Sequence, residues 1–154
     1  MLSFIGEYTC KLDHKGRMVV PVAIREALSG AGETLLVLHE NLFNNCINLY
    51  TKTSWERLIA DIQTPRAPLS RQESDFVREF SRGTAAVTPD ESSGRILVPR
   101  KMLDRLGATD ALLLAGQGAR LEIWEPTRYE QAALPPEQRA AMAEEIYQRL
   151  SRQP

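Results

Sequence analysis

A six-residue string near the N-terminus returns in the second half of the chain. Residues 16–21 read GRMVVP and residues 94–99 read GRILVP, at an offset of 78 residues. The correspondence continues beyond the proline, and residues 47–50 match residues 121–124 at an offset of 74. A repeat that covers most of each half indicates two copies of one structural unit.

Each copy has the signals of a ββαββ unit. In the first copy, residues 7–12 and 17–20 predict two strands that form a β-hairpin around a turn at residues 13–16. Pro21 then precedes a short helix that ends at Ser29-Gly30. The remaining predicted elements are strands 34–39 and 46–50 and, in the second copy, helix 99–106 before Gly107, strand 111–115, a turn at Gly116-Gln117-Gly118 and strand 120–124.

One such unit is too small to be stable alone. Four strands and one short helix in about 45 residues bury little apolar surface. We therefore expect the two copies to interleave their strands into a pseudo-symmetric pair with one shared core. The predicted fold class is mainly β with short helices (α+β), built from two tandem ββαββ modules.

Helices are predicted outside the two copies. Thr53–Glu56 and Ser70–Glu73 are capping boxes, and Pro65 and Pro68 separate the helices that follow them. A third helix follows Pro135-Pro136. Its narrow apolar stripe is typical of local packing or of a subunit contact. The apolar positions of the three helices are Trp55, Leu58, Ile59 and Ile62, then Phe76, Val77 and Phe80 before Gly83, then Met142, Ile146 and Leu150.

These signals predict four segments. They are a first module at 1–52, a helical connector at 53–82, a second module at 83–126 and a helical tail at 127–154. A chain with 43% hydrophobic and 25% charged residues is typical of a soluble globular protein. No apolar run approaches the ~20 residues that span a bilayer, and the N-terminus lacks a signal-like core, so we expect a cytoplasmic protein without membrane contact.

The chain has few cysteines and histidines, the residues that bind zinc. Cys10 and Cys46 have no CxxC spacing, and His14 and His39 are the only histidines, so we predict no metal site and no cofactor. The cysteines are expected to be small buried hydrophobic residues, although one disulfide between them stays open at this point.

The net charge of −1 is unusual for a protein that binds nucleic acid. The charges are unevenly distributed, however. Residues 11–25 hold four basic residues against one acidic residue, and residues 91–105 hold four against two. The two copies therefore each carry a basic island on a nearly neutral chain.

An acidic residue precedes an arginine by four positions in both turns, as Asp13 with Arg17 and Glu91 with Arg95. The acid and the arginine are either a structural brace within the turn, or the acid shapes the turn while the arginine binds phosphates or guanine edges. The duplication favours DNA binding. The candidate DNA contacts are Lys11, Lys15, Arg17, Arg95 and Arg100, and the candidate turn-shaping residues are Asp13, Gly16, Glu91 and Gly94.

The usual signals of an enzyme are missing. The sequence shows no nucleophile with its base and no phosphate-binding loop, and Gly116-Gln117-Gly118 is only a GxG between strands. Asp13 beside His14 is a remote candidate for acid–base chemistry, because neighbours on a hairpin point in different directions. We therefore predict that the chain is not an enzyme and takes no small-molecule substrate.

The turns DHKGRMVVP and ESSGRILVP, with AGQGARLEIWEPTRYE, resemble the MraZ family from about Ile5 to about Gln131. The resemblance implies two tandem SpoVT-AbrB-type modules, also called swapped-hairpin or double-split β-barrel domains. It also implies a nucleoid-associated transcriptional regulator, typically a repressor of the division and cell-wall gene cluster that includes its own gene. The family's acid-x-x-x-arginine motif falls on Asp13 with Arg17, and Glu91 departs from the aspartate usual in the second motif. Arg17 is therefore expected to be the better contact.

The resemblance further implies a homo-oligomeric closed ring that binds double-stranded DNA at direct repeats in its own promoter. A ring answers the charge objection, because several tethered cationic turns raise the effective concentration on one duplex. Repeats spaced near one helical turn, about 10 base pairs, would present the same DNA face to adjacent subunits. The alternative is an antitoxin-like or scaffold protein-interaction module whose tail helix binds a partner protein.

Overall fold

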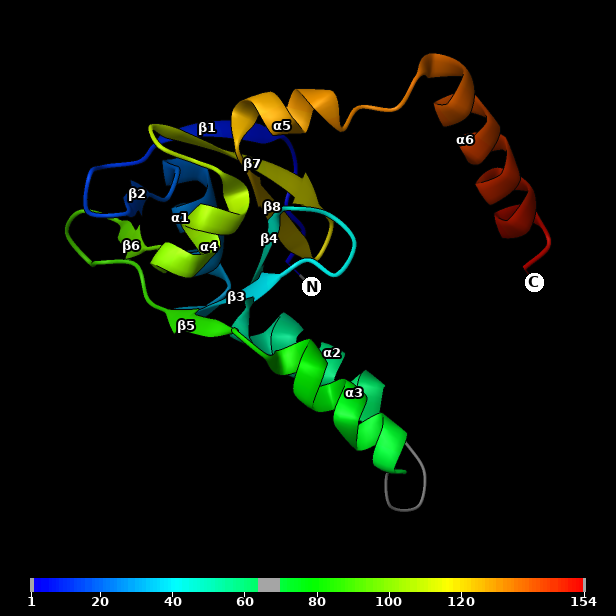
Figure 1. The fold of residues 1–154 in the computed structure, drawn as a ribbon, viewed down its shortest axis with the longest axis horizontal. Coiled ribbons are helices and arrows are strands. Elements are labelled where there is room, and N and C mark those ends of the chain that lie inside the picture. The colour runs from blue at the N-terminus through cyan, green and yellow to red at the C-terminus, as the bar shows by residue number, and fades with distance from the viewer. Residues whose placement is uncertain (1, 64–69, 154) are drawn as a thin grey trace.

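The computed structural model describes residues 2–63 and 70–153, which form eight strands and six helices (Figure 1). The fold is mixed α+β, which confirms the predicted α+β class, but helices contribute more residues than strands, so the structure is not mainly β. The elements are β1 (Glu7–Lys11), β2 (Arg17–Val19), α1 (Val22–Gly30), β3 (Leu36–Glu40), β4 (Ile47–Thr51), α2 (Lys52–Gln63), α3 (Arg71–Ser81), β5 (Ala85–Val87), β6 (Arg95–Leu97), α4 (Arg100–Leu106), β7 (Ala111–Gln117), β8 (Arg120–Trp124), α5 (Pro126–Gln131) and α6 (Pro136–Ser151).

A six-stranded antiparallel sheet mixes strands from both copies. Its order is β1-β7-β8-β4-β3-β5. The outer strand of each half therefore comes from the opposite copy, since β1 pairs with β7 and β5 pairs with β3. The centre of the sheet is the β4–β8 pair, in which Leu49 lies opposite Leu121. The order reads the same from both edges when repeat partners are exchanged, which confirms the expected interleaved, pseudo-symmetric pair.

The second sheet is a two-stranded ribbon made of β2 and β6. Met18 lies opposite Ile96 at its centre. At its ends the Val20 N–H donates to the Gly94 carbonyl and the Val98 N–H donates to the Gly16 carbonyl, each at 2.9 Å. The ribbon thus joins the two copies through equivalent hydrogen bonds.

The predicted β-hairpin between residues 7–12 and 17–20 is wrong over most of its length. Only an isolated bridge between Leu12 and Met18, and the 2.9 Å bond from the Asp13 N–H to the Arg17 carbonyl, connect the two segments. The physical reason lies in Met18 and Ile96, which are 0% and 2% exposed. Pairing β2 with β6 buries both side chains in the shared core, which a local hairpin would not achieve.

The core lies between the sheet, the ribbon and the two short helices. Ile24 and Leu28 of α1 are buried, as are their repeat partners Met102 and Leu106 of α4. The α4 helix ends as predicted, with Gly107 in the left-handed conformation at a φ of 69°. The predicted short helices are therefore confirmed, and α1 extends to Gly30. The fully buried residues of the core come from both copies and include Leu36, Leu38, Ile47, Leu49, Leu112, Leu114, Leu121 and Ile123.

The helices between the copies begin in different ways. The Ser70 hydroxyl accepts the Glu73 N–H at 3.1 Å, which confirms the second predicted cap. The first predicted cap is wrong, because α2 begins at Lys52 and the Thr51 hydroxyl accepts the Ser54 N–H at 3.0 Å. The last strand residue therefore also starts the helix, and no loop separates β4 from α2. The predicted break at Pro65 and Pro68 lies outside the described residues.

Aromatic residues hold a helix against the end of a strand in both copies. Trp55 of α2 packs on Tyr50 with ring centroids 5.5 Å apart, and Tyr129 of α5 packs on Trp124 at 5.8 Å. The Tyr129 hydroxyl also donates to Glu7 at 2.6 Å, which links α5 to β1. These pairs extend the pseudo-symmetry to the helices that follow β4 and β8.

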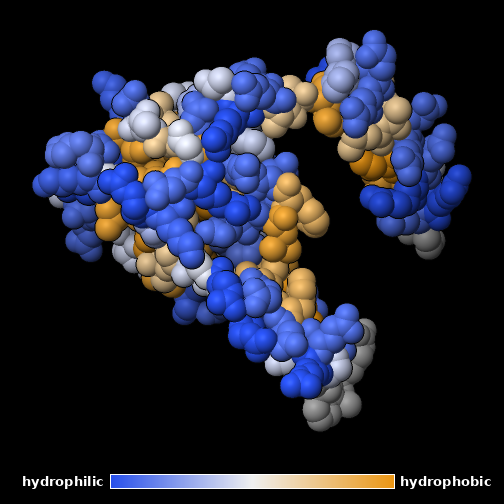
Figure 2. Space-filling view, in the orientation of Figure 1, coloured by the Kyte–Doolittle hydropathy of each residue, from blue (hydrophilic) through white to orange (hydrophobic). Residues whose placement is uncertain are grey.

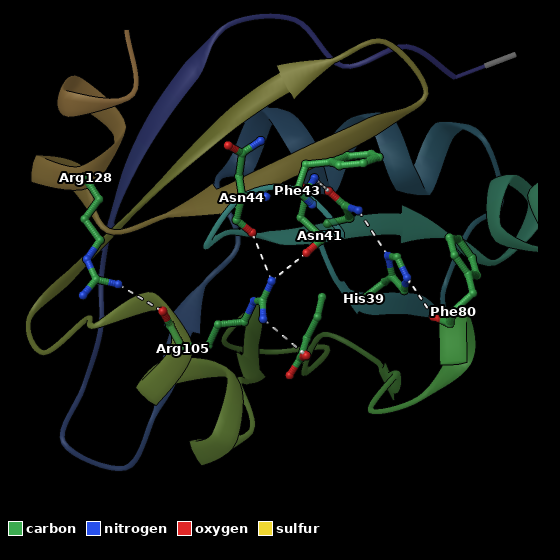
Figure 3. A network of polar contacts seen from close by, with 9 residues as sticks. His39, Asn41, Phe43, Asn44, Phe80, Arg105 and Arg128 are labelled. Carbon is green, nitrogen blue, oxygen red and sulfur yellow. Dashed lines mark hydrogen bonds and ion pairs between the residues drawn. The ribbon is translucent and has the colours of Figure 1, made fainter. Parts of the chain in front are cut away.

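Buried polar side chains form a network on the outer face of the sheet (Figure 3). The His39 Nε2–H donates to the Phe80 carbonyl at 2.9 Å, and the Asn48 amide donates to His39 Nδ1 at 3.1 Å. Asn41 then donates to Asn48 at 3.1 Å. Burial lowers the pKa of His39, so this imidazole is neutral and structural. The network joins α3 to the loop after β3.

The remaining helix, α6, carries its predicted apolar stripe outside the core. Met142, Ile146 and Leu150 are 44%, 41% and 52% exposed. Figure 1 places α6 at the opposite end of the molecule from β2 and β6, and Figure 2 shows its apolar side chains on the side that faces the body. None of the described helices is both long and apolar enough to cross a bilayer.

Candidate nucleic-acid interface

The two repeat turns lie next to each other at one end of the molecule. We define the first turn as residues 13–16, before β2, and the second turn as residues 90–94, before β6. Figure 1 shows both loops at its left edge, away from α3 and α6. Because β2 and β6 are antiparallel partners, each turn enters the ribbon from an opposite end.

The Asp13 carboxylate organises the first turn. Its Oδ1 accepts the N–H groups of Lys15 and Arg17, each at 2.9 Å, and its Oδ2 accepts the Arg17 Nε–H at 2.8 Å. The backbone N–H of Arg17, followed by the other hydrogen bonds and the charge of Arg17, lowers the pKa of Asp13 to about 2. Gly16 completes the turn at a φ of 82°, which other residues rarely adopt. Asp13 and Arg17 are therefore tied together at neutral pH.

The second turn is organised by Asp90 and not by Glu91. Asp90 Oδ1 accepts the N–H groups of Ser92 and Ser93 at 3.0 and 2.9 Å and the Ser92 hydroxyl at 2.7 Å. These bonds, led by the Ser93 N–H, lower the pKa of Asp90 to about 2. No hydrogen bond of the Glu91 carboxylate is seen within residues 2–63 and 70–153. The prediction of Glu91 as the turn-shaping residue is thus corrected to Asp90.

The reason for this correction is a one-residue difference in turn length. The Asp13 N–H bonds to the carbonyl of Arg17, four residues later, whereas the Asp90 N–H bonds to the carbonyl of Arg95, five residues later. A carboxylate that faces the backbone N–H groups of the longer turn must therefore sit one position earlier. Gly94, at a φ of 71°, matches Gly16 at the ribbon end of the turn.

The same difference leaves the two arginines in different states. The Arg17 side chain is 42% exposed and bound to Asp13. Arg95 is exposed, and in the described part of the chain its guanidinium has neither a hydrogen bond nor an ion pair. Arg95 is therefore the more available cation, which reverses the order expected from the sequence.

Both arginines lie on the outward face of the ribbon. Side chains alternate along a strand, so Arg17 and Val19 share the face opposite to buried Met18, and Arg95 and Leu97 share the face opposite to buried Ile96. Arg17 lies opposite Leu97 and Val19 lies opposite Arg95. The arginines are diagonal neighbours, about 7–8 Å apart along the Cα positions.

The other three predicted DNA contacts lie outside the strands of the ribbon. Lys15 is exposed in the first turn, Lys11 is exposed at the end of β1, and Arg100 is exposed at the first position of α4. Arg105 of the second basic island has a different role. It donates to the carbonyls of Asn41 and Asn44, as Figure 3 shows, and forms an ion pair with Glu40, so it joins α4 to the end of β3 and the loop after it.

Arg25 of α1 also lies at this site, although it is not part of the repeated turn motif. Its Nε–H donates to the Val20 carbonyl at 3.0 Å, and a Cβ built on Gly94 would lie 2.7 Å from its guanidinium. The repeat partner of Arg25 is Leu103, whose side chain lies against Gly16 in the first turn. A charged residue at a repeat position that holds a buried leucine in the other copy was the available signal.

The histidine and cysteine residues considered for catalysis or metal binding are either exposed or buried. His14 is exposed in the first turn, and Cys10 and Cys46 are free and buried. Burial raises the pKa of the Cys10 thiol to about 11 and that of Cys46 to about 12, so both are unreactive thiols. Within the described residues no group of three or more His, Cys, Asp and Glu side chains is arranged to hold a metal ion.

Comparison with known proteins agrees with this architecture. The family described as "MraZ protein, putative antitoxin-like" matches residues 3–77 and again residues 80–149. The transcriptional regulator MraZ of Bacteroides thetaiotaomicron is 30% identical over 153 residues, 99% of this chain and 97% of the relative. Those of Dictyoglomus turgidum and Cytophaga hutchinsonii are each 34% identical, over 83% and 82% of both chains. The chain therefore belongs to the MraZ family and contains two tandem MraZ repeats.

Proposed function

We propose that the chain is a sequence-specific DNA-binding transcriptional regulator that binds the double helix through the ribbon and its two turns. The observation that carries the proposal is the placement of Arg17 and Arg95 on one outward face, at equivalent positions of two interleaved repeats. The relatives are transcriptional regulators, which is consistent with a protein that is not an enzyme.

The dimensions of the ribbon suit the major groove. Two strands lie about 5 Å apart, and a groove about 12 Å wide admits a two-stranded ribbon. Arginine forks on that face can donate charge-assisted, often bidentate, hydrogen bonds to phosphates or to guanine edges. Lys15 and Lys11 add charge on the side of the first turn, and Arg25 and Arg100 are further basic residues on α1 and α4.

The assembly is proposed to be a homo-oligomeric ring. A single chain with a net charge of −1 offers only two basic turns to DNA. Several chains on one ring supply the same contacts repeatedly, which raises the effective concentration of each turn after the first has bound. Direct repeats near one helical turn apart would then be bound by neighbouring subunits.

The proposed biological role follows from family membership. We propose a cytoplasmic, nucleoid-associated repressor of the division and cell-wall gene cluster that includes its own gene. The proposed modules are swapped-hairpin, double-split β-barrel domains of the SpoVT-AbrB type, with boundaries at 1–52 and 83–126, a connector at 53–82 and a tail at 127–154. No cofactor is part of this proposal.

The test is a band shift on the region upstream of the gene. The Arg17→Ala/Arg95→Ala double variant is expected to lose binding, and each single variant is expected to weaken it, with the oligomer unchanged on size exclusion. The matched control is Arg78→Ala/Arg82→Ala, which removes the same charge from two exposed arginines, one in the last turn of α3 and one at its C-cap. Equal binding by the double variant and the control would reject the ribbon as the DNA-binding surface.

A second candidate function rests on α6. Its exposed apolar stripe of Met142, Ile146 and Leu150 is a surface for a partner protein, as in an antitoxin-like or scaffold module. Deleting residues 135–154 separates the two functions. Loss of a protein partner with intact DNA binding would establish a second role, whereas no DNA binding by the full-length chain at low salt would favour this candidate alone.

A further inference from the structure

Two aliphatic side chains share the outward face of the ribbon with Arg17 and Arg95. Val19 is 39% exposed and Leu97 is 57% exposed, although their neighbours Met18 and Ile96 are buried on the opposite side of the ribbon. Val19 lies directly opposite Arg95 and Leu97 lies directly opposite Arg17. Each arginine is therefore paired across the ribbon with an exposed aliphatic side chain.

The arrangement is repeated and not isolated. Val19 and Leu97 are separated by the 78-residue offset of the repeat, so the same kind of side chain stands at the same place in both copies. A single exposed aliphatic residue needs no explanation, but a repeated pair beside two arginines does. Aliphatic side chains have little affinity for phosphates, so phosphate binding does not explain the pair. A surface that bound only the sugar–phosphate backbone would gain nothing from these residues.

The base edges of DNA offer one apolar group in the major groove, the 5-methyl group of thymine. Contacts between that methyl and apolar side chains distinguish thymine from the other bases. An open hollow lies beside Val19, with Glu7, Lys11 and Pro21 among its lining residues, so this side chain is accessible from solvent.

We propose that Val19 and Leu97 are specificity-determining residues that contact thymine methyl groups, while Arg17 and Arg95 bind the adjacent phosphates or guanine edges. This inference rests on the proposed function, because it requires the outward face of the ribbon to enter the major groove. Apolar contacts would then supply part of the recognition of base sequence. Each DNA repeat that is bound by one subunit is therefore expected to contain thymines.

The experiment replaces thymine by uracil, which lacks only the methyl group. The full-length protein first selects its best duplex from a random-sequence pool, and that duplex is made with thymine and with uracil throughout. For the unmodified protein the dissociation constant is expected to rise about fourfold for each methyl contacted. For Val19→Ser/Leu97→Ser the two duplexes are expected to bind equally. The control Ile5→Ser changes a residue that is 80% exposed, next to the bridge between Phe4 and Gly118, and should keep the full ratio.

The outcomes separate this inference from the proposed function. If no duplex is enriched and none is bound, the proposed function fails. If the selected duplex is bound equally well with uracil, or if Val19→Ser/Leu97→Ser keeps the full ratio, DNA binding stands and this inference is overturned. A changed oligomer size with an unchanged ratio also overturns it, because the face would then be a protein contact. Thermal unfolding checks the fold, and the two single variants replace the double variant if it melts early.

Discussion

The two turns have nearly the same sequence after the glycine but different chemistry before it. In the first turn, Asp13 binds the Arg17 guanidinium as well as the backbone. In the second turn, Asp90 binds only backbone and serine groups, and the Arg95 guanidinium has no partner in the part of the chain that the structure describes. A single added residue therefore converts an arginine that is held in place into one that is available.

The surroundings of the two turns differ in the same direction. Gly16 faces the buried side chain of Leu103, whereas Gly94 faces the guanidinium of Arg25. A guanidinium that is already fixed loses less side-chain entropy on binding DNA, but Arg17 must also leave or share Asp13. We conclude that two copies of a duplicated motif can keep the same place in the fold while they differ in turn length and in the contacts of their arginines.

The largest expected effect is on DNA affinity. Arg95→Ala is expected to weaken specific binding by about 2–3 kcal/mol and Arg17→Ala by about 1 kcal/mol, because only Arg95 has its whole fork available. The dependence of affinity on salt should fall by a similar amount in both variants, since each loses one charge. Titrations by fluorescence anisotropy at several salt concentrations measure both quantities. A larger loss for Arg17→Ala would contradict the assigned difference between the turns.

The next effect is on stability. Gly16→Ala is expected to lower the free energy of unfolding by about 2 kcal/mol and Gly94→Ala by about 1 kcal/mol. Both changes force alanine to a positive φ, but a Cβ at position 16 also meets Leu103 Cδ1 at 3.1 Å, in the core. A Cβ at position 94 would meet Arg25 Cδ, Nε and Cζ at 2.7 Å, but these atoms belong to a flexible, partly exposed side chain that can move. Urea unfolding measures the difference, and equal losses would show that the surroundings of the turns do not matter.

Arg25→Leu makes the surroundings of the second turn resemble those of the first. We expect binding to weaken by about 1 kcal/mol and the salt dependence to fall by about one contact. Arg78→Leu on α3 is the control, because Arg78 is an exposed arginine paired with Asp75. Affinity equal to that of the control variant would remove Arg25 from the interface.

The smallest effect concerns the titration of the turn carboxylates. Arg17→Ala should raise the pKa of Asp13 from about 2 toward its ordinary value, without reaching it, because the backbone N–H groups still donate to it. Arg95→Ala should leave the pKa of Asp90 unchanged, because its lowering comes from Ser93 and Ser92. Carboxyl carbon shifts followed by NMR across the acid range report both values. A rise at Asp90 in Arg95→Ala would reveal an ion pair in solution.

The same lowered pKa values define how the turns respond to pH. A carboxylate whose pKa is lower in the folded protein stabilises the fold above its ordinary pKa of 3.8 and loses this contribution as the pH falls toward 2. Between pH 5 and 8 both carboxylates stay ionised. Any change in DNA affinity over that range must therefore come from other groups.

Most of the architecture was predictable from the repeat. The strings around Pro21 and Pro99 predicted the helices that follow them, and the small size of each copy predicted the shared core. The partner of β2 was not predictable, because local turn signals favour a hairpin whereas burial of Met18 and Ile96 favours the other copy. Thr51 as a cap was missed because a strand residue was assigned no role in the helix.

The candidate site was predictable in its location and less so in its details. Arg17 and Arg95 were found by motif, and the structure brings them to one face. The turn-shaping role was assigned to Glu91, although Asp90 lies one residue earlier, because an alignment anchored on Gly94 hides the added residue in the second turn. Arg25 was missed because it comes from the helix of one copy and lies against the turn of the other, so only a comparison with its repeat partner Leu103 could have pointed to it.

The exchange of outer strands has a consequence for how the ribbon is maintained. Since β1 lies on β7 and β5 lies on β3, half of the chain expressed alone would need a second half-chain to complete its sheet. Here the covalent connection supplies that second half at every protein concentration. Dilution therefore cannot take apart the pair of turns within one chain.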